Sequence, residues 1–181
     1  MLWREGKLNR DIIARDAAVL AQAFGLGGDA KSAKFFMVEE TGIGPDHPLS
    51  DEKLSLVLTL YRAKDFTQAK RIGAEILDHL GKGHSIGIHT QNMHHARELA
   101  EEIDVVRVLV NQAHTFGNGG GFDNGLPFTL SMGCGTWQGN SITDNLNYRC
   151  FLNITHLVTT IPEDKPGEKE LFGGYWEKYG K

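Results

Sequence analysis

The feature that most constrains the fold is a strand–helix–strand–helix–strand alternation in the middle of the chain. Continuous apolar runs predict buried strands over residues 54–61, 85–89 and 105–110. Apolar residues at helical spacing predict two helices between them, one capped by Asp65 and the other over residues 92–102. Because two crossovers of this length bring successive strands parallel, the sequence predicts an α/β fold, a parallel sheet with flanking helices.

The N-terminal part of the chain adds a helix and a strand to this pattern. Asn9 is a favourable N-cap, and apolar residues follow it at helical spacing, which predicts a helix over residues 9–24. A short apolar run predicts a strand over residues 35–38, and a Gly- and Pro-rich loop is expected over residues 41–50.

Regular patterning stops after the last of these strands. Residues 117–141 are Gly-rich but match neither phosphate-binding glycine motif, so we expect irregular backbone that lines a cleft or a subunit contact. A β-prone segment, 157–161, precedes a charged stretch. We therefore expect one domain over residues 1–161 and a C-terminal tail over residues 162–181.

Composition excludes several classes of protein. Of the 181 residues, 40% are apolar and 23% are charged, as in globular proteins. The net charge of −4 argues against nucleic acid or an anionic membrane as a partner. No apolar run approaches the roughly 18 residues of a membrane helix, and the N-terminus lacks the apolar centre of a signal peptide. Two cysteines without CxxC spacing suit the reducing cytoplasm.

Histidines and one cysteine are the first candidates for chemistry. Five histidines lie close together in sequence: His84, His89, His94, His95 and His114. Their spacing crosses a strand and enters a helix, so they share no face and we expect no metal site, although a histidine metal site stays an alternative. Cys134, flanked by glycines, is either a nucleophile with His84 or His114 as base or a buried structural thiol, and Cys150 is expected to be structural.

Four segments resemble the CoA-acylating aldehyde dehydrogenases in that family's order and spacing. They are DEKLSLVLTLYRAKDFTQA (51–69), GKGHSIGIHT (81–90), VVRVLVNQ (105–112) and LSMGCGTWQGNSITDNL (130–146). The resemblance covers about residues 2–161, and the sulfoacetaldehyde or short-chain acylating type is the most similar. It implies an oxidoreductase that converts a small aldehyde, CoA and NAD or NADP to an acyl-CoA through a Cys thioester.

The resemblance also implies roles for individual residues. His84 matches the family's G-H-[ST] motif, which implies an acid–base or CoA-positioning role. Glu52 falls where the superfamily places a carboxylate on the ribose hydroxyls, and Leu54 falls where an apolar residue packs near the nicotinamide. The match departs at Leu56, where many members have proline. Cys134 falls at a Gly-Cys-Gly position that is not the family nucleophile, which favours a structural thiol.

The family's nucleophilic Cys motif and its dinucleotide-binding domain precede the segment that matches Leu2. We therefore expect the chain to be the C-terminal part of a catalytic domain and to be inactive by itself. The alternative function is a non-catalytic interaction module, in which Leu157–Ile161 adds to a neighbour's sheet edge, as the C-terminal strand does in the family's homo-oligomers.

Overall fold

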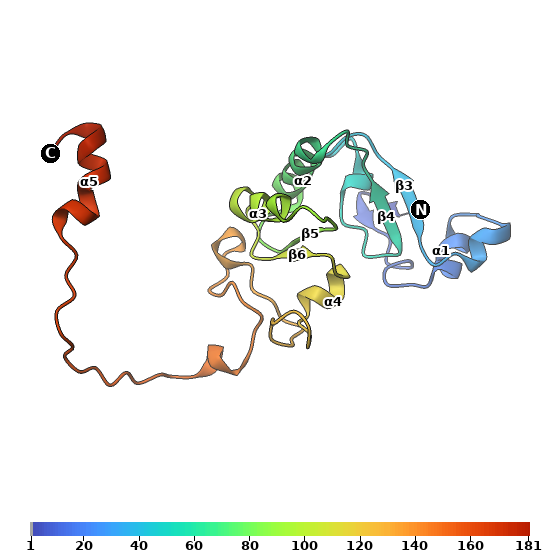
Figure 1. Ribbon diagram of the computed structural model, residues 1–181. Coiled ribbons are helices and arrows are strands. Elements are labelled where there is room, and N and C mark those ends of the chain that lie inside the picture. The colour runs from blue at the N-terminus through green and yellow to red at the C-terminus, as the bar shows by residue number, and fades with distance from the viewer. Residues whose placement is uncertain (1) are drawn as a thin grey trace. The chain divides into compact units, whose positions relative to one another are not determined.

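The computed structural model describes residues 2–181 and shows two compact units. The first unit ends at Cys150 and contains the paired strands (Figure 1). The second runs from Phe151 to Lys181 and contains the helix α5 (Glu168–Tyr179), which sequence periodicity did not predict. The sequence-based domain boundary after residue 161 stays a prediction.

A short hairpin opens the described chain. β1 (Trp3–Arg4) pairs antiparallel with β2 (Lys7–Leu8). The turn between them consists of Glu5 and Gly6, with φ of 51° and 72°. Two successive residues with positive φ are typical of the two-residue turns whose twist matches a hairpin.

The helix α1 (Ala17–Ala23) begins later than the sequence predicts. The predicted start at Asn9 is wrong because Ala14 has φ of 53°, which lies outside the right-handed helical region. Asn9 instead closes a turn, in which its side-chain oxygen accepts a hydrogen bond from the backbone N–H of Asp11 at 3.1 Å. The C-terminal limit is confirmed, with Gly25 at φ of 70° just beyond the helix.

β3 (Phe36–Glu39) and β4 (Val57–Leu60) form the first parallel pair. One face is turned to the core, where Val57 is buried. On the other face, Met37 lies opposite Leu58, and the two residues are 58% and 54% exposed. Both strands were predicted, and the pair has a single covered face.

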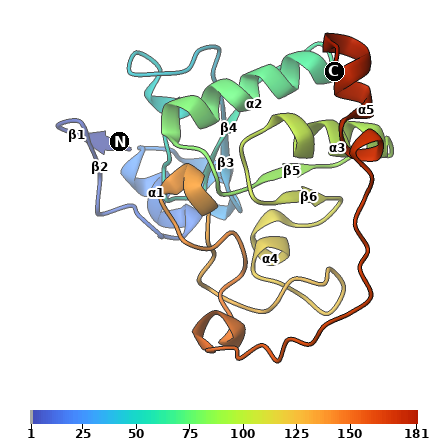
Figure 2. The ribbon, with the colours of Figure 1, turned by 90° about the vertical axis from the view of Figure 1, so that its left-hand side faces the viewer.

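β5 (Ile86–Ile88) and β6 (Val108–Val110) form the second parallel pair. Within the described residues no strand ladder joins β4 to β5, so the predicted sheet is divided into two small ones. The α/β class, the parallel pairing and the flanking helices are confirmed. Figures 1 and 2 show α3 (Met93–Glu102) and α4 (His114–Asn118) on opposite sides of this second pair.

The helix α2 (Phe66–Leu80) begins where the sequence predicts. The carboxylate of Asp65 accepts a hydrogen bond from the backbone N–H of Gln68 at 2.8 Å, which satisfies one donor of the first turn. The ammonium group of Lys70 forms ion pairs with Glu98 and Glu102 of α3, so a charged contact holds the two helices together.

Each parallel pair has its own apolar cluster. The first consists of Leu2, Ile12, Leu20 and Val57, against which Trp3, Phe24, Phe36, Val38 and Leu49 pack. The second consists of Leu99, Ile103 and Val105, with Phe66, Ala74, Leu77, Ile86, Ile88 and Val108 around it. α1 therefore covers the first pair, and α2 and α3 cover the second.

The rest of the chain is largely irregular, as predicted for the Gly-rich stretch. Short 3-10 turns occur at Gly135–Gln138 and Tyr148–Phe151. Residues 152–167 carry no helix or strand, so the β-prone segment Leu157–Ile161 forms no strand within the second unit. None of the described helices has the length and the apolar character needed to cross a membrane.

Two aspartates at helix N-caps give a matched test of this fold. We expect Asp65→Ala to lower the free energy of unfolding by about 1 kcal/mol, because it removes the cap of α2. Asp16→Ala is the control, since Asp16 occupies the N-cap of α1 without a side-chain capping bond. Urea unfolding followed by circular dichroism measures both variants, and an equal loss in the two would contradict the assignment.

Candidate functional site

His84 lies two residues before the start of β5, and its imidazole is exposed. The preceding Gly83 pairs through its backbone with the segment that leads into β6. A Cβ atom at Gly83 would lie 2.8 Å from the carbonyl oxygen of Cys134 and 3.1 Å from the Cβ of Trp137. A side chain at this position would therefore push the segment that carries Cys134 and Trp137 away from His84.

The hydroxyl of Ser85 is the centre of a cluster that includes His84. Its Oγ lies 2.6 Å from Nδ1 of His84 and 2.8 Å from Nε2 of His114. The amide Nδ2 of Asn118 donates a third hydrogen bond to the same oxygen at 3.0 Å. One hydroxyl thus joins two imidazoles and an amide.

Two features place the partners of Ser85. His114 and Asn118 are four residues apart on α4, so one helix face carries both side chains. Gly87 allows this face of α4 to approach β5, because a Cβ atom at Gly87 would lie 2.7 Å from Nδ1 of His114. Burial lowers the pKa of His114, and the neighbouring imidazole of His84 lowers it further.

A buried arginine holds the backbone around this cluster. The side chain of Arg107, 5% exposed, donates from Nε to Oδ1 of Asn145 at 3.0 Å. Its Nη1 donates to the carbonyl oxygens of Gly133 at 3.1 Å and His84 at 3.4 Å. Asn145 in turn donates to the carbonyl oxygen of Asn118 at 2.8 Å. The segment that carries His84 and the helix α4 therefore belong to one hydrogen-bond network.

The Arg107 guanidinium carries a charge, and no carboxylate is among its hydrogen-bond partners. Burial lowers the pKa of Arg107, while the field of Cys134 and Asp144 opposes that effect. Among the described residues, Nη2 of Arg107 and Oδ1 of Asn118 are buried without a hydrogen-bond partner. The first is a donor and the second an acceptor of the same network, so each can form one more hydrogen bond.

Glu52 and Leu54 lie on the loop that enters β4, and both side chains are exposed. Lys53 fixes this loop by donating from Nζ to the carbonyl oxygen of Leu49 at 2.8 Å, and burial lowers the pKa of Lys53. The carbonyl oxygen of Leu54 accepts from the N–H of Ala14 at 2.8 Å. Between the described residues, no hydrogen bond or ion pair joins Glu52 to the Ser85 cluster.

The other histidines do not join the cluster. The ring of His95 stacks on Phe66 at a centroid distance of 4.0 Å, which gives it a packing role. Over the part of the chain that the structure describes, no three His, Cys, Asp or Glu side chains converge as a metal site would need. Cys134 is half-buried and Cys150 is exposed, and neither is in a disulfide.

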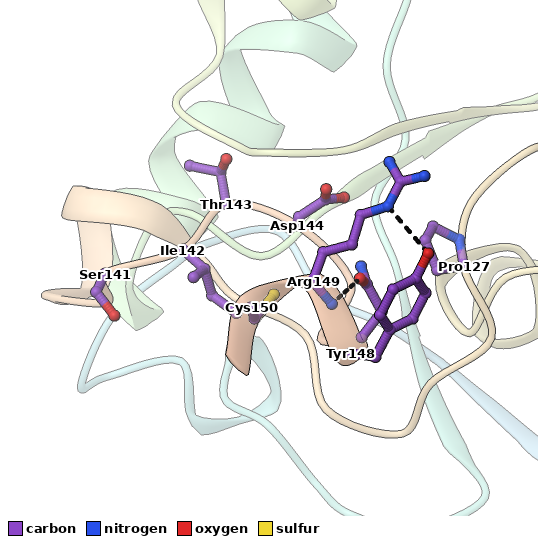
Figure 3. Close-up of a pocket in the computed structure, with 9 residues that line it drawn as sticks. Pro127, Ser141, Ile142, Thr143, Asp144, Tyr148, Arg149 and Cys150 are labelled. Carbon is purple, nitrogen blue, oxygen red and sulfur yellow. Dashed lines mark hydrogen bonds between the residues drawn. The ribbon is translucent and has the colours of Figure 1, made fainter. Parts of the chain in front are cut away.

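A separate polar pocket of about 630 Å³ lies near the end of the first unit. Its lining residues are Pro127, Ser141, Ile142, Thr143, Asp144, Asn147, Tyr148, Arg149 and Cys150. Figure 3 shows Nε of Arg149 donating to the phenolic oxygen of Tyr148 at 3.4 Å. Sequence patterning gave no signal for this pocket, because its walls are irregular backbone.

Sequence reasoning singled out His84 and His114 but missed the residue between them. Ser85 belongs to the same G-H-S triplet as His84, so its position was visible while its contacts were not. The spacing of His114 and Asn118 was the available signal for a shared helix face.

Comparisons with known proteins identify relatives across the chain. No family model matches the sequence. Over 182 aligned residues the chain is 48% identical to the sulfoacetaldehyde dehydrogenase (acylating) of Cupriavidus necator, and it is 40% identical to the enzyme of that name in Bilophila wadsworthia. These alignments cover 100% and 99% of this chain but only 37% and 40% of the two relatives.

The fold agrees with the sequence comparison. The crystal structure of a probable aldehyde dehydrogenase from Listeria monocytogenes matches 90% of this chain and 36% of that protein, with a TM-score of 0.79 and 32% identity. The chain thus spans well under half the length of the proteins that it matches. By sequence and by fold, it is a homologue of the acylating aldehyde dehydrogenases over about a third of their length.

Proposed function

We propose that this chain is the C-terminal part of the catalytic domain of an NAD(P)-dependent acylating aldehyde dehydrogenase. The reaction takes an aldehyde, CoA and NAD(P)+ to an acyl-CoA and NAD(P)H, with the nucleophilic cysteine outside this chain. The observation that carries the proposal is 48% identity, over the whole chain, to a sulfoacetaldehyde dehydrogenase (acylating). That relative makes a small anionic aldehyde the first substrate to test.

Two free cysteines support a cytoplasmic location.

His84 is the proposed acid–base or CoA-positioning residue. Its exposed imidazole has Nδ1 on the hydroxyl of Ser85, which leaves Nε2 as the nitrogen that meets a substrate. The carbonyl oxygen of His84 is held by the Arg107 guanidinium, so the backbone beneath the ring is fixed. A general base with a fixed ring orientation can take the proton of the CoA thiol at Nε2.

Glu52 and Leu54 are the proposed cofactor-binding residues. The Glu52 carboxylate is exposed and can accept hydrogen bonds from ribose hydroxyls, and Leu54 presents an exposed apolar side chain two residues away. These side chains fit the ribose and nicotinamide portions of NAD(P). The cofactor supplies a hydride acceptor when bound. The remaining dinucleotide contacts belong to the length that this chain does not span.

The first test uses the isolated chain. We expect the purified 181-residue protein to reduce neither NAD+ nor NADP+ with an aldehyde and CoA, because neither Cys134 nor Cys150 matches the family nucleophile. Absorbance of the reduced cofactor measures this, with the full-length Cupriavidus necator relative as positive control. Turnover by the chain would contradict the proposed absence of the nucleophile, and Cys134→Ser would then identify the replacement thiol.

The second test joins this chain to the part of a relative that it does not span. A chimera that carries this chain in place of the matching segment of the Cupriavidus necator enzyme should form acyl-CoA. In that chimera, His84→Ala should lower kcat/KM by about 10²-fold, since a positioned general base contributes about that much or more. His94→Ala, at an exposed position of α3, is the control and should keep the rate. A folded but inactive chimera would overturn the proposal.

A second candidate function is a self-associating module of the same fold. Leu157, Val158 and Ile161 are 94%, 84% and 80% exposed, and they lie in a segment that forms no strand within the second unit. An extended apolar segment with unpaired backbone can add to the sheet edge of a second copy. This exposure is the observation that favours homo-oligomerisation through the C-terminal strand.

Sedimentation across a concentration series tests this candidate. We expect the unmodified chain to form oligomers and Val158→Asp to be monomeric, because a charge in the apolar segment opposes its burial. Thr155→Asp places the same charge at an exposed position two residues before the apolar segment and should weaken association less. A strictly monomeric unmodified chain would exclude the candidate.

A further inference from the structure

Three nitrogen atoms use the full hydrogen-bonding capacity of the Ser85 hydroxyl. Its Oγ lies within hydrogen-bond distance of His84 Nδ1 (2.6 Å), His114 Nε2 (2.8 Å) and Asn118 Nδ2 (3.0 Å). A serine hydroxyl provides one proton and two lone pairs. Because the Asn118 amide only donates, it occupies one lone pair, which leaves one proton and one lone pair for the two imidazoles.

This count fixes what the imidazoles can do. One of them must donate an N–H to Oγ, and the other must accept the hydroxyl proton. The arrangement is satisfied when both rings are neutral, and it is equally satisfied when one extra proton is added to either ring. It fails when both rings are cationic, because three donors would then compete for two lone pairs.

We propose that Ser85 makes His84 and His114 a proton relay that holds a single extra proton. In the neutral state Nδ1–H of His84 donates to Oγ, and Oγ–H donates to Nε2 of His114. When a proton binds at Nε2 of His84, the Nδ1–H bond breaks as a new Oγ–H bond forms, while the original Oγ–H proton moves to Nε2 of His114. The positive charge passes to His114, and no other reactant is needed.

The surroundings favour a mobile proton. The hydrogen-bond partners of the relay are neutral, and no carboxylate among the described residues pairs with His84 or His114 to trap the charge. Arg107 is the neighbouring cation, and it contacts the carbonyl oxygen of His84 through Nη1. Cys134 lies beside Gly83 through its carbonyl oxygen and its Cβ atom. Partial burial already disfavours the charged form of His114, so the proton returns to His84 without an opposing salt bridge.

The catalytic meaning of the relay rests on the proposed function. In that reaction His84 takes the CoA thiol proton at Nε2, and the relay moves the positive charge to His114. His84 is then neutral with the thiol proton still on Nε2, and it becomes a base at Nε2 again when the relay runs back and Nε2 releases that proton. The relay itself requires only the contacts of the present chain. It is therefore tested without turnover, and its failure would leave the proposed function standing.

The experiment is a pH titration of the histidine ring signals of the full 181-residue chain by NMR. Nitrogen shifts should identify His84 as the Nδ1–H tautomer and His114 as the Nδ1–H tautomer with a bare Nε2 near neutral pH. Between about pH 8 and pH 5 the pair should bind one proton, and the second midpoint should lie more than about one pH unit below the first. Two protons with equal midpoints, or an Nε2–H tautomer at His84, would overturn the relay.

Variants separate the relay from a structural role. Ser85→Ala should reduce the ratio of the two proton-binding affinities by at least about threefold, so that the two midpoints move together. Ser85→Thr, which retains the hydroxyl, should keep the separation of the midpoints. Ser32→Ala is the control, since the Ser32 hydroxyl donates to the carbonyl oxygen of Asp29 away from this cluster. An unchanged separation in Ser85→Ala would contradict the proposal. If that variant does not fold, the tautomers of the unmodified chain decide the question.

Discussion

The buried guanidinium of Arg107 is the interaction on which the candidate site depends. It bonds to the segment before β5, to the Gly-rich stretch and to Asn145, which itself holds the carbonyl oxygen at the end of α4. The segment before β5 is far from the other two in sequence, whereas the segments around Gly133 and Asn145 also pair with each other through a backbone bridge between Met132 and Asn145. A charged donor that bonds to neutral acceptors from several segments makes their positions mutually dependent, because the loss of any one leaves a buried cation less solvated.

Periodicity predicted the elements whose structure is local. β3, β4, β5, β6, α2 and α3 follow from apolar runs, helical spacing and the cap Asp65. The start of α1 was not predictable in this way. Ala14 takes a positive φ while its N–H donates to the carbonyl oxygen of Leu54, a contact forty residues away in the chain. A tertiary hydrogen bond therefore overrides the helical tendency of the N-terminal sequence.

In the site, too, the local sequence predicts some residues, and others are brought in only by tertiary packing. The G-H-S triplet made His84 a candidate through family resemblance, and its place before β5 follows from the local pattern. The other two partners of Ser85, His114 and Asn118, are 29 and 33 residues away in sequence. Only the packing of α4 against the β5–β6 pair brings His114 and Asn118 to that hydroxyl, and no single-sequence pattern encodes this packing.

Glycine is important to the site both inside and outside the Gly-rich stretch, since a Cβ at Gly133 would collide with the carbonyl oxygen of Ile142. Gly125 and Gly139, in the Gly-rich stretch, have positive φ and open space around a would-be Cβ, so they serve the local turn. Gly83 and Gly87 lie outside that stretch, and at both a Cβ would collide with the site. Gly83 admits the Cys134 segment, and Gly87 admits the ring of His114. The contacts of His84 thus depend on two isolated glycines that let separate segments approach the same short strand.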